Sequence, residues 1–402
     1  MRALLRPLAV WGPGLLVMLA DADAGNVVTA AEAGREWGYR LVPLILLLIP
    51  LLYMVQELTV RLGIGTGRGL GELVEEHFGA LWAWLSLAAL AAATAASLVT
   101  EFTAVAGIGA LFGLSRSESL PLAAAFLLAV VATGSYRRAE RVALLVGLFE
   151  LAFFAVAFLA HPNLGTLARD AIDLPFGNPR FLYLAAAVIG AVFNPWMIFY
   201  QQSAVADKKL GLEDTRSARL DTAAGAVLTQ FLTGAVLVAC AAAFYTTPSA
   251  TQFQNFDEIS RALSLVLGEG AGRLVFGLGV LGASLVAAIV ASLAFAWGLG
   301  EVAGYRRTLE YRPFASGWFY GVYGCSLLGA GAVVLFVPDL VWLNIWAQVV
   351  NAFLLPLVIG PLLALAAKAL PEPLSPSRGY LIFLGVLAAA VCGVAVMGGL
   401  SF

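Results

Sequence analysis

Long apolar runs separated by short polar stretches repeat along the whole chain. A run of about 20 apolar residues crosses a bilayer as one helix. The runs lie near residues 11–33, 40–60, 80–112, 119–135, 141–160, 181–206, 218–246, 268–304, 314–337, 339–367 and 378–400. A membrane β-barrel would instead show segments of about 10 residues with alternating polarity. We therefore expect an all-α integral membrane protein with about eleven transmembrane helices in a single polytopic domain, residues 1–402.

The composition excludes several classes of soluble protein. Of 402 residues, 61% are hydrophobic and 12% are charged, which is about half the charged share of a soluble domain. The net charge is −2, without a basic block. These values exclude a cytosolic enzyme, a disordered scaffold and a nucleic-acid binder. The first run contains Asp21 and Asp23 and has no small-residue cleavage site, so we interpret it as a membrane segment and not as a signal peptide.

Cysteine and histidine suggest neither a disulfide framework nor a resident metal. Cys240, Cys325 and Cys392 are far apart and form no C-x-x-C pair. The chain has only two histidines, His77 and His161, so a site built on several imidazoles is excluded. We expect no cofactor.

The basic residues predict the orientation in the membrane. With the N-terminus inside, 16 of the 23 Lys and Arg residues fall on the inner side. The inner set is Arg2, Arg6, Arg61, Arg68, Arg137, Arg138, Arg141, Lys208, Lys209, Arg216, Arg219, Arg306, Arg307, Arg312, Lys368 and Arg378; the outer set is Arg35, Arg40, Arg116, Arg169, Arg180, Arg261 and Arg273. This positive-inside bias predicts a plasma-membrane protein with a cytoplasmic N-terminus and an extracellular C-terminus.

Two of the apolar runs are broken near their middle. The first contains D-A-D-A-G-N, from Asp21 to Asn26, and the sixth contains F-N-P-W, from Phe193 to Trp196, where Pro195 removes a backbone donor. Breaks five segments apart indicate a LeuT/APC-type 5+5 inverted repeat with a substrate site at the midplane. We expect repeat one over about 8–160, repeat two over about 181–367 and an extra helix over about 378–400.

The residues at these breaks favour a cation. Neither break contains Lys or Arg, and carboxylates inside a membrane usually mark a transport path. Asp23, Asn26 and Asn194, with the carbonyls of Ala20 and Ala191, form a candidate metal site made only of oxygen ligands. Such ligands suit Mg²⁺, Ca²⁺ and Mn²⁺. The alternative for either break alone is a simple kink with an interhelical hydrogen bond.

Four motifs in order resemble the Nramp family of divalent-metal transporters. D-A-G-N at Asp23–Asn26 resembles the family's first-helix D-P-G-N, and G-A-V-F-N-P-W-M at Gly190–Met197 resembles its sixth-helix G-A-x-V-M-P-H-N. Gln56–Leu73 resembles the end of helix two and its loop, and A-Q-V-V-N-A-F-L-L-P at Ala347–Pro356 resembles the tenth-helix S-Q-V-x-L-S-x-x-L-P. The resemblance implies transport of divalent metal, with Gln348 joining the site in some states.

The departures from the family pattern change the expected substrate. Ala24 stands at the family's proline, Asn194 at its methionine, and Trp196 and Gln201 at its two histidines. An amide oxygen in place of a thioether hardens the site and fits Mg²⁺, as in the Nramp-related magnesium transporters, which this pattern resembles. Asp21 has no counterpart in the motif. We expect Asp21 to add negative potential at the site. The alternative is that it caps the unwound first helix or bonds to a polar group of the third helix.

The same departures bear on proton coupling. Trp196 and Gln201 do not titrate near neutral pH, where His serves as a relay. The third segment keeps one acid, Glu101, but Leu98 stands where the family usually has an aspartate. We therefore expect an uncoupled uniporter. The alternatives for Glu101 are a proton relay and a buried acid bonded to Thr100 or to a neighbouring helix.

The remaining polar residues of the membrane segments are given structural roles. We expect interfacial ion pairs or gate contacts from four acids, which are Glu57, Glu150, Asp221 and Glu301. Trp196 lies beside the site, and we expect its bulk to shape the cavity of the ion.

The function expected from the sequence is secondary transport of Mg²⁺, and also of Mn²⁺, by alternating access. The metal is then a substrate, and the other expected partner is the lipid bilayer. No obligate protein partner is indicated, which is compatible with a monomer. The alternatives are a proton-coupled Mn²⁺/Fe²⁺ symporter, an amino-acid transporter of the same fold, and a membrane-embedded enzyme or receptor.

Overall fold

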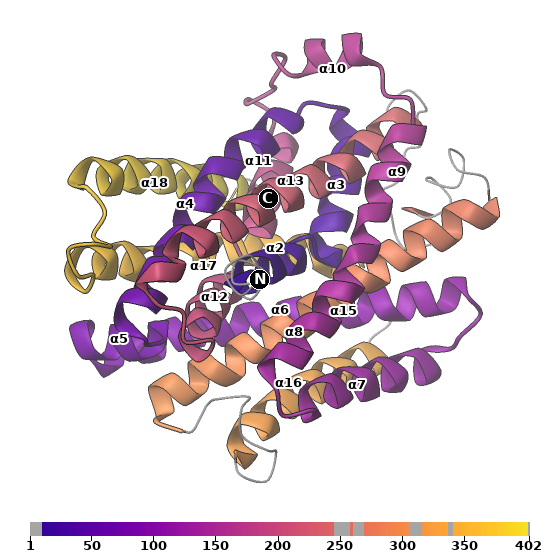
Figure 1. The fold of residues 1–402 in the computed structure, drawn as a ribbon. Coiled ribbons are helices and arrows are strands. Elements are labelled where there is room, and N and C mark those ends of the chain that lie inside the picture. Colours follow the sequence, from indigo (N-terminus) through magenta and orange to yellow (C-terminus); the bar gives the residue numbers. More distant parts are fainter. Residues whose placement is uncertain (1–9, 245–257, 260–268, 306–315, 337–340, 401–402) are drawn as a thin grey trace, which may run out of the picture.

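The computed structural model describes residues 10–244, 258–259, 269–305, 316–336 and 341–400. Six of the arginines used for the orientation lie outside these ranges: Arg2, Arg6, Arg261, Arg306, Arg307 and Arg312. Within the described ranges the secondary structure is helical throughout (Figure 1).

The helices follow the predicted runs closely. In the first half they are α2 (Pro13–Asp21), α3 (Ala24–Trp37), α4 (Val42–Thr66), α5 (Leu70–Phe78), α6 (Ala80–Leu111), α7 (Arg116–Ala132), α8 (Tyr136–Gly147), η1 (Leu148–Leu151), α9 (Ala152–Leu159) and α10 (Leu164–Asp170). In the second half they are α11 (Pro179–Val192), α12 (Pro195–Asp207), η2 (Leu212–Asp214), α13 (Thr215–Phe244), α15 (Glu269–Ala303), α16 (Gly317–Phe336), α17 (Val341–Lys368) and α18 (Arg378–Leu400).

The number of spans agrees with the expected eleven. Nine helices in the described ranges are long and apolar enough to cross a membrane, and the pair α2 and α3, bent by 48° at its break, makes a tenth. Helix α7 has 17 residues, which is the lower end of the spanning range, and we count it as the eleventh. The short helices α5 and α10 lie between spans and were not predicted, because neither contains a long apolar run.

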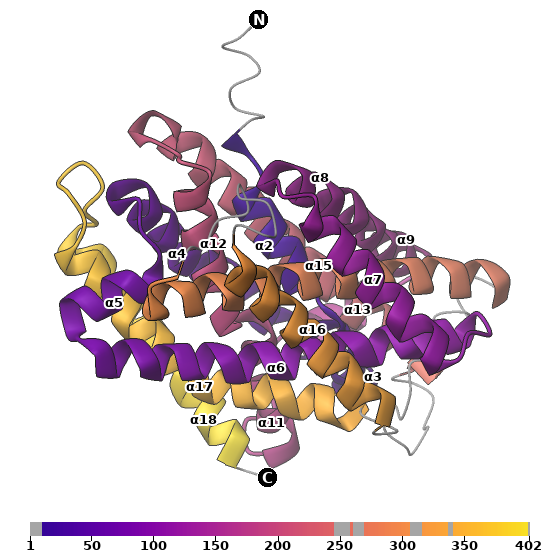
Figure 2. The same cartoon turned by 90° about the horizontal axis from the view of Figure 1, so that it is seen from below.

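The broken spans lie at the centre of the helix bundle. Of the most apolar part of α11 and α12, 89% is inside the protein, against 28% for α16 and for α18. Helices α18 and α7 lie toward opposite sides of the molecule in both views (Figures 1 and 2). Because an apolar outer surface faces lipid, this burial pattern places the polar breaks as far from the lipid as the fold allows.

The described part of the chain begins and ends on opposite faces. Figure 2 shows the first turn of α2 at the upper face and the end of α18 at the lower face. We call the first the N-terminal face and the second the opposite face. An odd number of spans requires this arrangement.

Candidate metal-binding site

Asp23 organises the first break. It is the residue before α3, and its Oδ1 accepts a hydrogen bond from the backbone N–H of Asn26 at 2.7 Å, the usual contact of a helix N-cap. The Asn26 side chain donates from Nδ2 to the backbone oxygen of Asp21 at 3.0 Å, across the gap between the helices. Asp23 Oδ2 is buried and has no hydrogen-bond partner in the described structure. One carboxylate oxygen therefore holds the helix and the other is left for a ligand.

Asn194 organises the second break. Phe193 leaves the helical conformation at φ −121° and ψ 74°, and Asn194 is extended, so α12 begins at Pro195. Proline fits the first position of a helix because no intrahelical partner is lost there. Asn194 Nδ2 donates to the carbonyl oxygen of Ala191 at 3.1 Å. Both expected ligands of this break therefore lie together at the end of α11.

Helix α17 joins the two breaks through Gln348 and Asn351. Asn351 Nδ2 donates to Asn194 Oδ1 and, at 3.1 Å, to Gln348 Oε1. A Cβ atom on Gly25 would lie 1.9 Å from Gln348 Nε2, and one on Gly190 would lie 1.7 Å from the backbone oxygen of Gln348. Gln348 is thus enclosed between α3 and α11, and only glycine leaves room for it at positions 25 and 190.

Three further carboxyl groups surround Asp23. Glu101 Oε2 accepts from the backbone N–H of Ala24 at 3.2 Å, and Asp21 Oδ2 accepts from the hydroxyl of Thr229 at 3.4 Å. Glu150 interacts electrostatically with both Asp21 and Asp23. Each of these acids is fully buried and keeps at least one oxygen without a hydrogen bond in the described structure. The site therefore gathers four buried carboxyl groups with oxygens left unbonded in the described structure, an arrangement that is expensive inside a membrane and favours a cation.

The structure brings most of the predicted site residues together. Asp23, Asn26, Asn194 and Gln348 meet at the two breaks, and Ala20 lies in the last turn of α2. Their roles as metal ligands remain predictions. Among the described residues no three His, Cys, Asp or Glu side chains are close enough to hold a metal. An ion here would thus rely on one or two carboxylates, amide oxygens, backbone carbonyls and water.

Two further predicted pathway residues, Gln201 and Trp196, lie on α12. Gln201 turns toward α13, where its Nε2 donates to Thr222 Oγ1 at 2.7 Å. Trp196 is fully buried in the first turn of α12, with no described hydrogen-bond partner for its indole nitrogen. Its effect on the cavity stays a prediction. The proposed partner of Asp21 on the third helix was wrong, because the hydroxyl that it meets belongs to Thr229 of α13.

Two residues near the site were missed from the sequence. Asn351 follows Gln348 by three residues and shares its helix face, so the tenth-helix motif contained a signal for it. Glu150 was expected at a membrane interface, which was wrong: it is buried in η1, and both of its oxygens lack a hydrogen bond in the described structure. Only the fold shows that this acid is close to Asp21 and Asp23.

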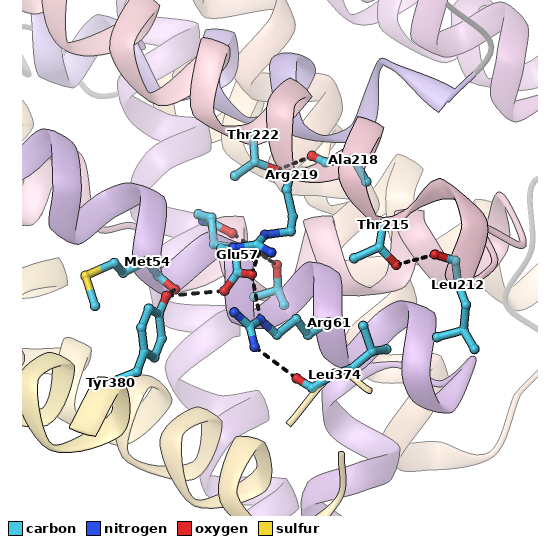
Figure 3. A network of polar contacts seen from close by, with 12 residues as sticks. Met54, Glu57, Arg61, Leu212, Thr215, Ala218, Arg219, Thr222, Leu374 and Tyr380 are labelled. Atoms are coloured by element: carbon cyan, nitrogen blue, oxygen red, sulfur yellow. Dashed lines mark hydrogen bonds and ion pairs between the residues drawn. The ribbon is translucent and has the colours of Figure 1, made fainter. Parts of the chain in front are cut away.

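The other three acids that were expected to form ion pairs or gate contacts, Glu57, Asp221 and Glu301, connect helices at the N-terminal face. Glu57 forms ion pairs with Arg61 at 2.6 Å and Arg219 at 2.8 Å, and accepts from the Tyr380 hydroxyl at 3.2 Å (Figure 3). This cluster joins α4, α13 and α18, as expected for an ion pair. Glu301 accepts hydrogen bonds from the backbone N–H of Gly71 and from Ser203, so it connects α15 with α5 and α12.

Asp221 connects the start of α2 to α13 through hydrogen bonds. Its carboxylate accepts from the backbone N–H groups of Gly12, Gly14 and Leu15 at 3.1, 2.8 and 3.1 Å. These groups have no partner within the first turn of a helix. Lys208 adds a contact to the carbonyl of Trp11 at 2.9 Å. These contacts join the start of α2 to α12 and α13 at the N-terminal face. The site residues named above are at most 2% exposed.

Comparison with known proteins identifies the family. The model of the "Natural resistance-associated macrophage protein-like" family, Nramp, matches residues 14–401. The chain belongs to the Nramp family. Nramp proteins are metal transporters and not enzymes, so the enzyme alternative is excluded.

Three individual relatives agree with this assignment. The chain is 28% identical over 301 residues to the divalent metal cation transporter MntH of Brucella suis, an alignment that covers 72% of this chain and 66% of that protein. It is 29% identical over 372 residues to MntH of Yersinia pestis, covering 89% of this chain and 86% of that protein. The crystal structure of the Eremococcus coleocola manganese transporter superposes with a TM-score of 0.78 at 19% identity, covering 97% of this chain and 86% of that chain. The expected fold, an all-α membrane protein of the LeuT type, is confirmed; the repeat boundaries remain predictions.

Proposed function

We propose that this Nramp protein carries hard divalent cations, Mg²⁺ foremost and Mn²⁺ as well, by alternating access. The observation that carries the proposal is the donor set: Asp23 has a free carboxylate oxygen, and the second break contributes the amide of Asn194. Asn351 and Gln348 add two more amides beside Asn194. Oxygen ligands of this kind suit Mg²⁺, whereas a thioether would favour softer metals.

The arrangement suits an ion that keeps part of its water. Mg²⁺ dehydrates reluctantly and is usually held by one or two carboxylates with several waters retained. The Asn194 oxygen already accepts from Asn351, and the Ala191 carbonyl already accepts from Asn194. Each of these oxygens has one lone pair engaged, so an entering ion that binds it directly must share it with the existing donor. Retained water can instead bond to the amides, which both donate and accept.

We also propose that transport proceeds down the electrochemical gradient without obligatory proton movement. Gln201 and Trp196 do not titrate near neutral pH, and the amide of Gln201 is bonded to Thr222 on α13. A membrane potential supplies about 2.3 kcal/mol per charge per 100 mV, and twice that for a divalent ion. The potential alone is therefore a sufficient driving force.

A second candidate is proton-coupled Mn²⁺ or Fe²⁺ transport. It is favoured by Glu101, whose carboxylate lies against the residue next to Asp23, and by the names of the relatives, MntH and manganese transporter. An amino-acid substrate fits less well. Four buried acids, Asp21, Asp23, Glu101 and Glu150, would repel the carboxylate of an amino acid at these breaks.

The N-terminal face is proposed to be the cytoplasmic one, in the plasma membrane. Arg61, Arg68, Lys208 and Arg219 lie on helices or loops at that face, in agreement with the positive-inside rule. A membrane-impermeant thiol reagent tests the orientation. We expect a cysteine introduced at exposed Glu372 to react only from the cytoplasm, and reaction from outside would reverse the assignment.

Flux into proteoliposomes tests the function. We expect Mg²⁺ and Mn²⁺ uptake without a change of lumenal pH, no uptake by Asp23→Ala, and a lower Mg²⁺-to-Mn²⁺ ratio for Asn194→Met. The conservative variant Asn194→Gln, which keeps the amide, serves as the control for packing. Mn²⁺ uptake that acidifies the lumen, without Mg²⁺ uptake, would establish the second candidate instead.

A further inference from the structure

Glu150 interrupts the fifth span. The span Tyr136–Leu159 changes from α-helix to the 3₁₀-helix η1 at Leu148–Leu151 and then returns to α-helix. A 3₁₀ segment inside a long helix often marks a functional position. Glu150 lies in this segment, is fully buried, and has neither oxygen hydrogen-bonded in the described structure. A buried carboxylate without partners needs an explanation.

The side chain of Glu150 lies beside the end of α2. A Cβ atom on Gly147 would lie 3.6 Å from Glu150 Oε1 and 2.9 Å from Leu19 Cδ1. The Glu150 carboxylate and the Leu19 side chain thus both pack near the Cα atom of Gly147. Leu19 is two residues before Asp21, where α2 ends. Glu150 is therefore on the side of the first break that faces α8 and α9, whereas Asn194 approaches the site from α11 and α12.

Asp21 is a second buried acid that, like Glu150, keeps an oxygen without a hydrogen bond. Its Oδ2 accepts from Thr229, but its Oδ1 is buried and has no partner in the described structure. Asp21 is also the last residue of α2, where the negative end of the helix dipole adds to its charge. No described Lys or Arg forms an ion pair with either acid. Both features favour a positive charge between α2 and η1.

We propose that Glu150 and Asp21 form an outer-sphere binding position, which accepts hydrogen bonds from water retained by the divalent cation at Asp23. The inference deepens the proposed function and rests on it. Direct ligation by all of these acids is not the geometry found, since no three of them are close enough to hold a metal. A bridging water extends the reach: a Mg–O distance of about 2.1 Å and a hydrogen bond of about 2.7 Å place a carboxylate oxygen roughly 4–5 Å from the ion.

The position would also contribute to selectivity. Mg²⁺ is held with several of its waters, whereas metals that lose water more readily rely on direct ligands. Removing the charge at Glu150 should therefore weaken Mg²⁺ more than Mn²⁺. A purely structural role for Glu150 would change the two ions equally.

The test is the isosteric variant Glu150→Gln, measured in proteoliposomes. We expect the KM for Mg²⁺ to rise roughly tenfold, which corresponds to about 1.4 kcal/mol, and the KM for Mn²⁺ to rise less than threefold. Asp21→Asn should show the same split and provides a second route if Glu150→Gln does not fold. Glu118→Gln, at an exposed position of α7, removes one charge far from the site and should leave both values unchanged.

Hexaamminecobalt(III) probes the outer sphere directly, because its ammonia ligands do not exchange and imitate bound water. We expect it to compete with Mg²⁺ on the unmodified protein, and to compete about tenfold less well on Glu150→Gln. No competition on a protein that does transport Mg²⁺ would overturn the outer-sphere position. An equal change for Mg²⁺ and Mn²⁺ in both variants would also overturn it. Absence of Mg²⁺ uptake by the unmodified protein would instead contradict the proposed function.

Discussion

Gly25 offers the sharpest test of how α17 contributes to the site. A Cβ atom at this position would lie 1.9 Å from Gln348 Nε2, 3.1 Å from Gln348 Cδ and 3.3 Å from Asp23 Oδ1. Ordinary contact begins near 3.4 Å, so Gly25→Ala requires the Gln348 amide to move by about 1.5 Å. The nearest obstructing atom is the end of a flexible side chain. The amide can therefore swing aside without unfolding the protein.

The expected result is a loss of transport with little loss of stability. A displacement of about 1 Å at a functional group can lower a rate about 100-fold, and we expect Gly25→Ala to reduce Mg²⁺ flux at least tenfold. The melting temperature in detergent should fall by only a few degrees. The contrast is Gly190→Ala, whose Cβ would lie 1.7 Å from a backbone oxygen of α17. Because backbone cannot swing aside, this variant should lose stability as well as flux.

Two comparisons isolate the cause. Gly360→Ala adds a methyl group to α17 where nothing lies within 4 Å, and it should leave flux unchanged and the helix slightly more stable. If Gly25→Ala acts only through Gln348, the double variant with Gln348→Ala should match Gln348→Ala alone, which is a non-additive cycle. Wild-type flux in Gly25→Ala would refute the close contact. Additive losses in the double variant would refute the role assigned to Gln348.

Two further predictions concern the N-terminal face. Asp221→Ala removes the acceptor for three backbone N–H groups at the start of α2, those of Gly12, Gly14 and Leu15. Amide exchange at these three residues should quicken at least tenfold, while Asp170→Ala on the opposite face should not affect it. Unchanged exchange would show that Asp221 does not hold α2 in place. Glu57→Gln leaves Arg61 and Arg219 facing each other, with Arg219 44% exposed, and should cost about 1–3 kcal/mol of stability in thermal unfolding. Adding Arg219→Gln should restore part of the loss. No change of stability in either variant would refute the network of Figure 3.

The sequence was sufficient for the spans and for both breaks. Apolar length alone predicts a helix over 42–66 or 80–111, because the bilayer imposes that length whatever the tertiary contacts are. The breaks were also local: an acid beside Gly25 and an Asn-Pro pair disrupt a helix by their own chemistry. Helices α5 and α10 are short and polar on one side, so they gave no such signal.

The sequence was insufficient wherever a side chain had a choice of neighbours. Gln201 lies two turns along α12 from Asn194, and its direction toward Thr222 depends on the packing of α13. Glu57 pairs with Arg61 one turn away, which periodicity can suggest, but also with Arg219, which is distant in the chain. Glu150 was grouped with the acids expected near segment ends, and only the fold shows that it packs beside the end of α2. Long-range packing, and not local propensity, decides these contacts.

Helix α2 connects the site to the contacts at the N-terminal face. It has nine residues; its first turn is held by Asp221, and its last residue, Asp21, belongs to the group of four buried acids. On the proposed function, a cation at this group of acids is stabilised by them only while the end of α2 is in place. The ion would then have different affinities for the two states of an alternating-access cycle. Such a difference is what a ligand needs to shift a conformational equilibrium. To turn a population from 1:99 to 99:1 requires about 5.5 kcal/mol. Interactions of one divalent ion with several buried carboxylates are of a sufficient size to supply it.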